Sequence, residues 1–303
     1  MDKQERLIHK AKRLLRRLGY PRWLHHYGPK TYELYEHMCG LLIRCFCKLS
    51  YRRAKQLCDL LDIHCPSKSA LHYTAAKLGP QFWQRIVALT GHNPYVAAFD
   101  STGFSRTNPS YHYTRRIDGK TPKVFVKLNA SFDTRTKRFC AAKAKLQPMH
   151  DTQDMPYLLT RTNPTIGVAD KGYSSEKLFQ LADEQGIVLM IPKRAHAKRG
   201  HYRKKMYRRF RTRTYNRRQL IEAGFSSVKR KFGGSVSAKK ALTIRAEVYG
   251  KLACHNIFGK LQRLLGQSRM YTQIFKYINH YLKAWQISIR KKCQNSLPKQ
   301  TSR

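Results

Sequence analysis

The chain has 303 residues, 41% of them hydrophobic, so it can bury a core and is too apolar to be a disordered polycation. Its 61 lysines and arginines outnumber 17 acidic residues, giving a formal net charge of +44. Such a charge favours a polyanionic partner, and we expect nucleic acid rather than an anionic membrane surface. No apolar stretch approaches the roughly 20 residues of a spanning helix, and the first residues lack the apolar core of a signal peptide. We therefore expect a cytoplasmic, nucleoid-associated protein.

The N-terminal region, 1–90, is predicted to be helical and to bind DNA. Helical spacing of apolar residues indicates helices over 1–25, 31–48, 51–63 and 68–77. Ser50 and Ser67 stand where they can cap the third and fourth of these helices. A helix, a turn and a second helix with polar and basic residues are typical of a helix-turn-helix. The alternative is a plain helical hairpin that packs on the next domain.

Cysteines are concentrated in this region, where five of the eight lie between residues 39 and 65. This density is compatible with a zinc site, but the chain contains no C-x2-C pair, which argues against one. Cys45 and Cys47 are two residues apart in a helical segment, so their side chains point to different sides. We expect ordinary buried thiols in a reducing compartment.

From about residue 91 the periodicity changes and predicts an α/β catalytic domain over 91–262. Strand-like runs occupy 95–99, 123–132, 137–146, 166–169 and 187–191. Helical segments occupy 152–159 and 174–183 between these runs, and 239–267 and 270–291 after them. This order indicates a mixed sheet flanked by helices. Residues 263–303 are expected to form a C-terminal helix and tail.

A strongly basic segment interrupts this domain at 193–214, where 11 of 22 residues are lysine or arginine. Aromatic residues and histidines are interleaved with these charges. That mixture favours a loop that contacts nucleic acid. A solvated, disordered loop is the alternative.

Two apolar runs each lead directly into an aspartate, Asp100 and Asp170. In sheets with parallel strands, ligands bind beyond the carboxyl ends of the strands, so both carboxylates should reach one edge. Neighbouring carboxylates repel each other unless a cation neutralises them, and oxygen ligands favour Mg²⁺ or Mn²⁺ over Zn²⁺. Two such ions, ~3.5–4 Å apart, can stabilise the attacking and leaving oxygens of a phosphodiester displacement. The pattern predicts metal-dependent phosphoryl transfer on DNA.

A third acid, Glu222, lies on a predicted helix with Tyr215, Arg218 and Lys229. At 100° per residue these four positions fall within about 60° of the helix circumference. An adjoining apolar strip can seat the helix on the sheet: Ile221, Phe225 and Val228. Glu222 can therefore face the two aspartates as the third metal ligand. The alternative is an i,i+4 ion pair with Arg218 on a solvated helix, worth about 0.2–0.5 kcal/mol.

These residues resemble the DDE transposases of bacterial and archaeal insertion sequences, the IS4 and IS5 groups. The signature of that family around the catalytic glutamate is matched at every position by Tyr215, Arg218, Glu222 and Lys229. The segments Phe99–Thr102 and Asp170–Tyr173 are similar to those at the family's two aspartates. Only 51 residues separate Asp170 from Glu222, too few for the large β insertion of some relatives. The resemblance therefore points to the IS5-like side.

The resemblance implies an RNase H-like fold, with Asp100 on the first strand, Asp170 after the fourth and Glu222 on a later helix. It implies two Mg²⁺ or Mn²⁺ ions held by these acids, cleavage at the element's ends, and attack of the freed 3′-OH on target DNA. Arg218 and Lys229 would bind end phosphates, and Tyr215 would contact a displaced base. A homodimer on double-stranded DNA is expected, because strand transfer needs two ends together.

Two other functions use the same sequence features: an RNase H-like nuclease or resolvase without strand transfer, and a non-catalytic basic DNA-binding protein. Four further acids are expected not to bind metal. Asp151 and Asp154 are explained by a helix N-terminus, and Asp118 and Asp133 are turn residues.

Overall fold

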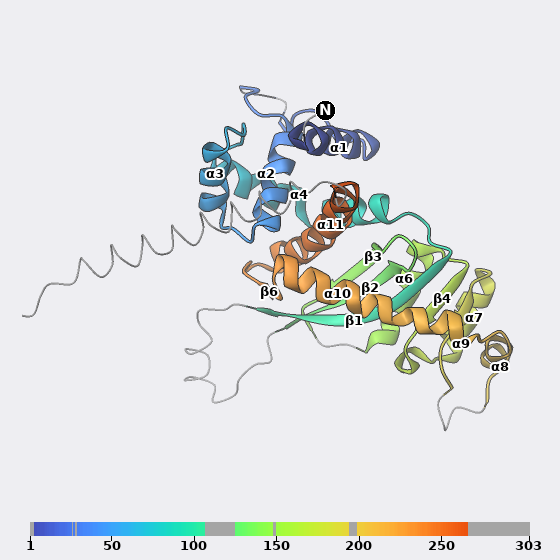
Figure 1. Ribbon diagram of the computed structural model, residues 1–303. Coiled ribbons are helices and arrows are strands. Elements are labelled where there is room, and N and C mark those ends of the chain that lie inside the picture. Colours follow the sequence, from blue (N-terminus) through green and yellow to red (C-terminus); the bar gives the residue numbers. More distant parts are fainter. Residues whose placement is uncertain are drawn as a thin grey trace, which may run out of the picture. The chain divides into compact units, whose positions relative to one another are not determined.

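The computed structural model describes residues 3–25, 27, 29–106, 125–147, 150–193 and 199–265 (Figure 1). Residues 1–257 form one compact unit. Among the described residues, no helix is long and apolar enough to cross a membrane. The predicted helix at 270–291, the tail and Asp118 lie outside the described residues.

Four helices precede the sheet, as predicted: α1 (Lys3–Arg17), α2 (Leu34–Phe46), α3 (Tyr51–Leu60) and α4 (Lys68–Gly91). Both predicted caps are confirmed. Ser50 Oγ accepts a hydrogen bond from Arg53 N, and Ser67 Oγ accepts one from Ala70 N, each at 3.3 Å. These bonds satisfy amide groups that the first turn of a helix leaves unpaired.

Helix α4 extends beyond its predicted end at residue 77. It bends at Gly79, whose φ of 62° requires no side chain, and then continues through Pro80 into the core with Phe82 and Ile86 fully buried. The connection between α2 and α3, residues 47–50, has a length typical of a helix-turn-helix, whereas the connection to α4, 61–67, is longer. DNA binding by this region stays a prediction.

The cysteines of the described part are free thiols, and most are buried, as expected: Cys39, Cys58, Cys65, Cys140 and Cys254. Three of them pack within or beside α2, α3 and α4. They therefore contribute to the core of the helical region.

The predicted mixed sheet is confirmed. The described strands are β1 (Val96–Arg106), β2 (Phe125–Asp133), β3 (Arg138–Lys145), β4 (Ile166–Ala169), β5 (Val188–Met190) and β6 (Ser235–Val236). Their order is β3-β2-β1-β4-β5, with β6 also paired to β1. The pairs β1–β2 and β2–β3 are antiparallel, whereas β4 and β6 pair with β1, and β5 with β4, in parallel.

Strand β1 is longer than predicted. Its pairing with β2 continues from Ala97 opposite Asp133 to Ser105 opposite Phe125, so the strand does not end at Phe99. The polar residues that follow the apolar run remain extended because β2 supplies their backbone partners. Asp100 therefore lies inside a strand, although it was predicted at a strand end. The predicted turn after β2 is confirmed, since Asp133 Oδ1 accepts a hydrogen bond from Arg135 N at 2.8 Å.

Helices cover both faces of the sheet. On one face, Phe99 belongs to a buried cluster with α6 (Met155–Thr162) and α7 (Glu176–Glu184). On the other face lies α10 (Gln219–Phe232), in orange in Figure 1, whose Phe225 ring stacks on Phe139 with centroids 5.6 Å apart. Side chains alternate between the two faces of a sheet along a strand, so Asp100 shares a face with Ala98. In the register of β1 and β2, Ala98 is opposite Phe132 and Asp100 is opposite Ala130. Asp100 therefore lies on the α10 face.

The basic segment was predicted as a loop, which is wrong for its second half. Residues 201–208 form α8 and Thr212–Tyr215 form the short α9, whereas 194–198 lie outside the described residues. Met206 of α8 is buried in the same cluster as Phe99, on the face of the sheet covered by α6 and α7. Glu176 Oε1 accepts a hydrogen bond from Tyr202 N at 2.8 Å. These long-range contacts hold the segment as a helix despite its charge. After β6 the chain forms α11 (Ala241–Leu265), as predicted.

Candidate active site

The first two acids meet because β1 and β4 are parallel neighbours. Phe99 is opposite Ala169, and Asp100 and Asp170 are the residues that follow each of them. Strand β4 ends there while β1 continues, so Asp170 begins a connection at the level of Asp100. Burial raises the pKa of Asp100, and the nearby Glu222 and Asp170 charges raise it further. The Ser101 N–H, 2.8 Å from Asp100 Oδ1, and the Arg218 guanidinium oppose this shift.

The third acid reaches the same place from α10. One guanidinium nitrogen of Arg218 lies 2.7 Å from a Glu222 carboxylate oxygen and 3.5 Å from an Asp100 oxygen. The predicted i,i+4 pair therefore exists, but it belongs to a cluster of acids around one cation. The pKa of Arg218 is raised by Glu222, Asp100, Tyr215 and Asp170 against the opposing effect of burial. Sequence reasoning missed this bridging contact, for which the only signal was the spacing of Arg218 and Glu222.

Tyr215 does not share a continuous α-helix with Glu222. It ends α9, and a 3₁₀ turn over Asn216–Arg218 precedes α10, while Tyr215, Asn216 and Arg218 keep right-handed helical backbone angles. The predicted α-helix is therefore interrupted by one tighter turn, which shifts Tyr215 around the helix axis relative to Glu222. The apolar strip on α10 itself is confirmed by the burial of Ile221, Phe225 and Val228. Tyr215 lies close to the same charged groups. Burial raises the pKa of its hydroxyl, Arg218 lowers it, and the Asp170 and Glu222 charges raise it.

Lys229 lies apart from the acids. Its ammonium is 5.7 Å from the centre of the Phe104 ring, toward the far end of β1. Seven residues of α-helix separate it from Glu222, a rise of about 10 Å. A single extended substrate could contact both ends of this helix face, but Lys229 does not touch the carboxylates.

Asp151 and Asp154, two of the acids expected not to bind metal, have structural partners. The helix N-terminus alone does not explain their position. Asp154 is buried, receives a hydrogen bond from Asn129 Nδ2 at 2.7 Å, and pairs with Lys143 at 3.1 Å and Lys145 at 2.7 Å. Asp151 pairs with Lys127 at 2.7 Å. Lysines of β2 and β3 therefore neutralise these carboxylates on the sheet face opposite α10.

The chemistry of the clustered acids fits a divalent metal. Asp100, Asp170 and Glu222 offer carboxylate oxygens, which suit Mg²⁺ and Mn²⁺. Arg218 now provides the positive charge between Asp100 and Glu222. In the part of the chain that the structure describes, no three His, Cys, Asp or Glu side chains are close enough to hold a metal ion.

Comparison with known proteins identifies the family. The family described as "Transposase DDE domain" matches residues 91–257, more than half of the chain. The match contains the sheet, α10 and all three acids, and it confirms the predicted RNase H-like fold. No curated protein matches the chain. Members of this family bind DNA, cleave nucleic acid in transposition and generally use divalent metal ions. The chain belongs to the DDE transposase family.

Proposed function

We propose that the protein cuts DNA at the ends of an insertion sequence and joins those ends to target DNA. The observation that supports this most directly is that Asp100 of β1 and Glu222 of α10 share Arg218, beside Asp170 at the end of β4. Among transposases, the motif around Glu222 and the short interval from Asp170 favour the IS4/IS5 superfamily, on its IS5-like side.

The three acids would serve as metal ligands. Burial disfavours the charged form of Asp100, whereas the Glu222 side chain is 52% exposed. Divalent ions held here, Mg²⁺ or Mn²⁺ and two in number by family resemblance, would supply activation of water or the 3′-OH and stabilisation of the leaving oxygen. The protein's own contribution is to hold the DNA in line with these acids.

Arg218, Tyr215 and Lys229 would position the DNA strand. Arg218 is shared between two carboxylates, so it can hold Glu222 in place and present a donor to a phosphate when the DNA enters. Tyr215 packs against Phe210 with ring centroids 5.3 Å apart, a platform on which a displaced base could stack. Lys229 would bind a phosphate further along α10.

We assign one function to each of the three predicted regions of the chain. The helical region 1–90 would bind DNA, 91–262 would carry out catalysis, and 263–303 would form the C-terminal helix and tail. A homodimer on DNA is proposed, because joining requires two element ends in one complex.

The proposal is tested with purified protein and a duplex that carries the DNA flanking its own gene, incubated with Mg²⁺, Mn²⁺ or EDTA. Metal-dependent cuts at the element ends, followed by joined products, are expected. Cuts without joining would indicate a nuclease or resolvase, and binding without cuts in either metal would indicate a non-catalytic DNA-binding protein. Either result would overturn the proposed function.

A further inference from the structure

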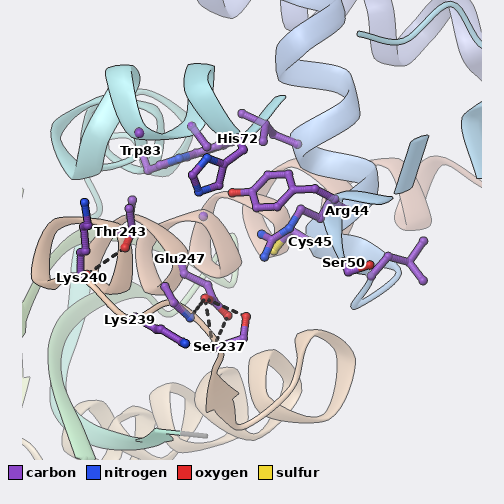
Figure 2. Close-up of a pocket in the computed structure, with 18 of the residues that line it drawn as sticks. Arg44, Cys45, Ser50, His72, Trp83, Ser237, Lys239, Lys240, Thr243 and Glu247 are labelled. Carbon is purple, nitrogen blue, oxygen red and sulfur yellow. Dashed lines mark hydrogen bonds between the residues drawn. The ribbon is translucent and has the colours of Figure 1, made fainter. Parts of the chain in front are cut away.

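A basic groove lies between the helical region and the segment that follows α10 (Figure 2). It has a volume of about 690 Å³, within the range of ligand sites in proteins. One side is formed by the end of α2, the start of α3 and the first half of α4, and the other by residues 237–240 and the first turns of α11. Its lining includes Arg44, Lys48, Tyr51, His72, Lys239 and Lys240.

The groove carries a surplus of positive charge. Its four lysines and arginines face one acidic residue, Glu247. The Glu247 carboxylate is already engaged, because it accepts hydrogen bonds from Ser237 N at 3.2 Å and Ala238 N at 3.0 Å and pairs with Lys251 at 3.8 Å. Figure 2 shows Glu247 turned to Ser237 in this way. Most of the lysine and arginine charge is therefore left for an external anion.

The half-buried Arg44 supports the same reading. Its guanidinium lies over the Tyr51 ring, 4.2 Å from the centroid, which fixes the plane of the fork. Its Nε is buried and donates no hydrogen bond within the described structure.

The groove is connected to the active site by α10. Glu222 lies in the first turn of this helix, and its last turn is basic, with Lys229, Arg230 and Lys231. Lys48 Nζ donates a hydrogen bond to Arg230 O at 3.0 Å, so the groove begins where α10 ends. The ten residues from Glu222 to Phe232 rise about 15 Å. That length corresponds to about four base pairs of duplex DNA at 3.4 Å each.

We propose that this groove binds the sugar–phosphate backbone of the DNA that flanks the cut, beginning about four base pairs from the scissile phosphate. A polymer is favoured over a small anion because the positive charge continues from Lys229 along α10 into the groove. Small apolar side chains between the charges leave room for deoxyribose: Ala75, Ala76 and Ala246. The inference rests on the proposed function, since it takes the position of the cut from the three acids.

The test combines a double variant with neutral phosphates placed along the DNA. Lys239→Ala/Lys240→Ala removes two exposed cations from the groove, and Arg161→Ala/Lys177→Ala on α6 and α7, also exposed, is the control of equal charge. Affinity for the flanking-DNA duplex is measured in EDTA at several salt concentrations, so cleavage plays no part. The groove variant should make the slope of log K against log salt less negative by about 2, and the control pair should change it less.

Methylphosphonates at single positions then locate the contact. The wild type should lose affinity when a phosphate about four to seven base pairs from the cut is neutralised, and the groove variant should lose nothing further there. Lys239→Arg/Lys240→Arg should restore the wild-type pattern. An identical pattern in wild type and groove variant, or equal effects of groove and control pairs, would overturn the inference.

The two proposals fail in different ways. If cleavage occurs in Mg²⁺ but the groove variant shows no coupling to any phosphate, the groove assignment is wrong and the proposed function stands. If coupling is found at a defined set of phosphates but no metal produces cuts, the groove still binds the DNA backbone, while the proposed function and the distance counted from a cut are wrong.

Discussion

Arg218 lies 3.5 Å from the Asp100 carboxylate across the boundary between α10 and the sheet, while the same guanidinium nitrogen pairs with Glu222 at 2.7 Å. One cation is thus shared by acids from two elements that are distant in sequence. Because its side chain is only 21% exposed, this charge is screened less than a surface charge. The arrangement holds the acids together and leaves their exposed oxygens available.

Glu222→Gln should abolish cleavage and leave DNA affinity almost unchanged. The substitution keeps the size of the side chain and removes the carboxylate that would bind metal, while the cations that attract DNA remain. Cleavage of an end-labelled duplex in Mg²⁺ and binding of the same duplex in EDTA measure the two effects. An active variant, or a large loss of binding, would contradict the assignment of Glu222.

Arg218→Gln should slow cleavage of bound DNA by about 100-fold or more, the effect of removing one preorganised charge-stabilising donor. It should also raise the pKa of Asp100, because Arg218 opposes the effects of burial and of the neighbouring acids. Single-turnover cleavage at saturating protein separates this loss from weaker binding. The matched control is Arg217→Gln, which removes the same charge from the exposed neighbouring residue. Equal cleavage by the two variants would show that the shared position of Arg218 has no catalytic role.

Asp154→Asn should destabilise the fold by about 3 kcal/mol, because it leaves two lysines beside a buried site without their counter-charge. The expected change is a lower Tm and a smaller free energy of unfolding in urea. The folded fraction should show the same dependence of cleavage on Mg²⁺ concentration as the wild type. A shift in that dependence, with Tm unchanged, would instead place Asp154 among the metal ligands.

The folded protein should lose stability in mild acid because of His37. Burial is the main cause of its lowered pKa, and its ring is 2.8 Å from Thr74 Oγ1. As pH falls below the usual value of about 6.5, the unfolded chain takes up a proton before the folded protein does. The stability contributed by neutral His37 is therefore complete above that pH and is lost as pH falls toward the folded pKa.

The measurement is Tm at pH 7.5 and pH 5.0 for wild type and His37→Gln. Glutamine keeps a hydrogen-bonding side chain near Thr74 but does not titrate. The difference in Tm between the two pH values should be smaller in the variant. A variant that loses as much stability in acid as the wild type would show that His37 is not the group responsible.

Much of the fold follows from local patterns. Ser50 and Ser67 cap helices because a hydroxyl can satisfy the amides of the next turn, whatever the rest of the chain does. The apolar runs before Asp100 and Asp170 became neighbouring parallel strands. Less could be inferred for the basic segment 193–214. Its charge favours a loop, whereas the burial of Met206 against the sheet stabilises a helix.

The sequence by itself determined which acids are candidates for the site, because the kinds of residue and their spacing on strands and on one helix are local properties. The tertiary structure alone decided which groups meet. β2 extends β1 past Asp100, a 3₁₀ turn tightens the helix after Tyr215, and Arg218 reaches an acid on another element. The groove lined by Arg44 and Lys239 likewise exists only because distant segments pack together. Such contacts depend on packing between segments far apart in sequence, which no local periodicity encodes.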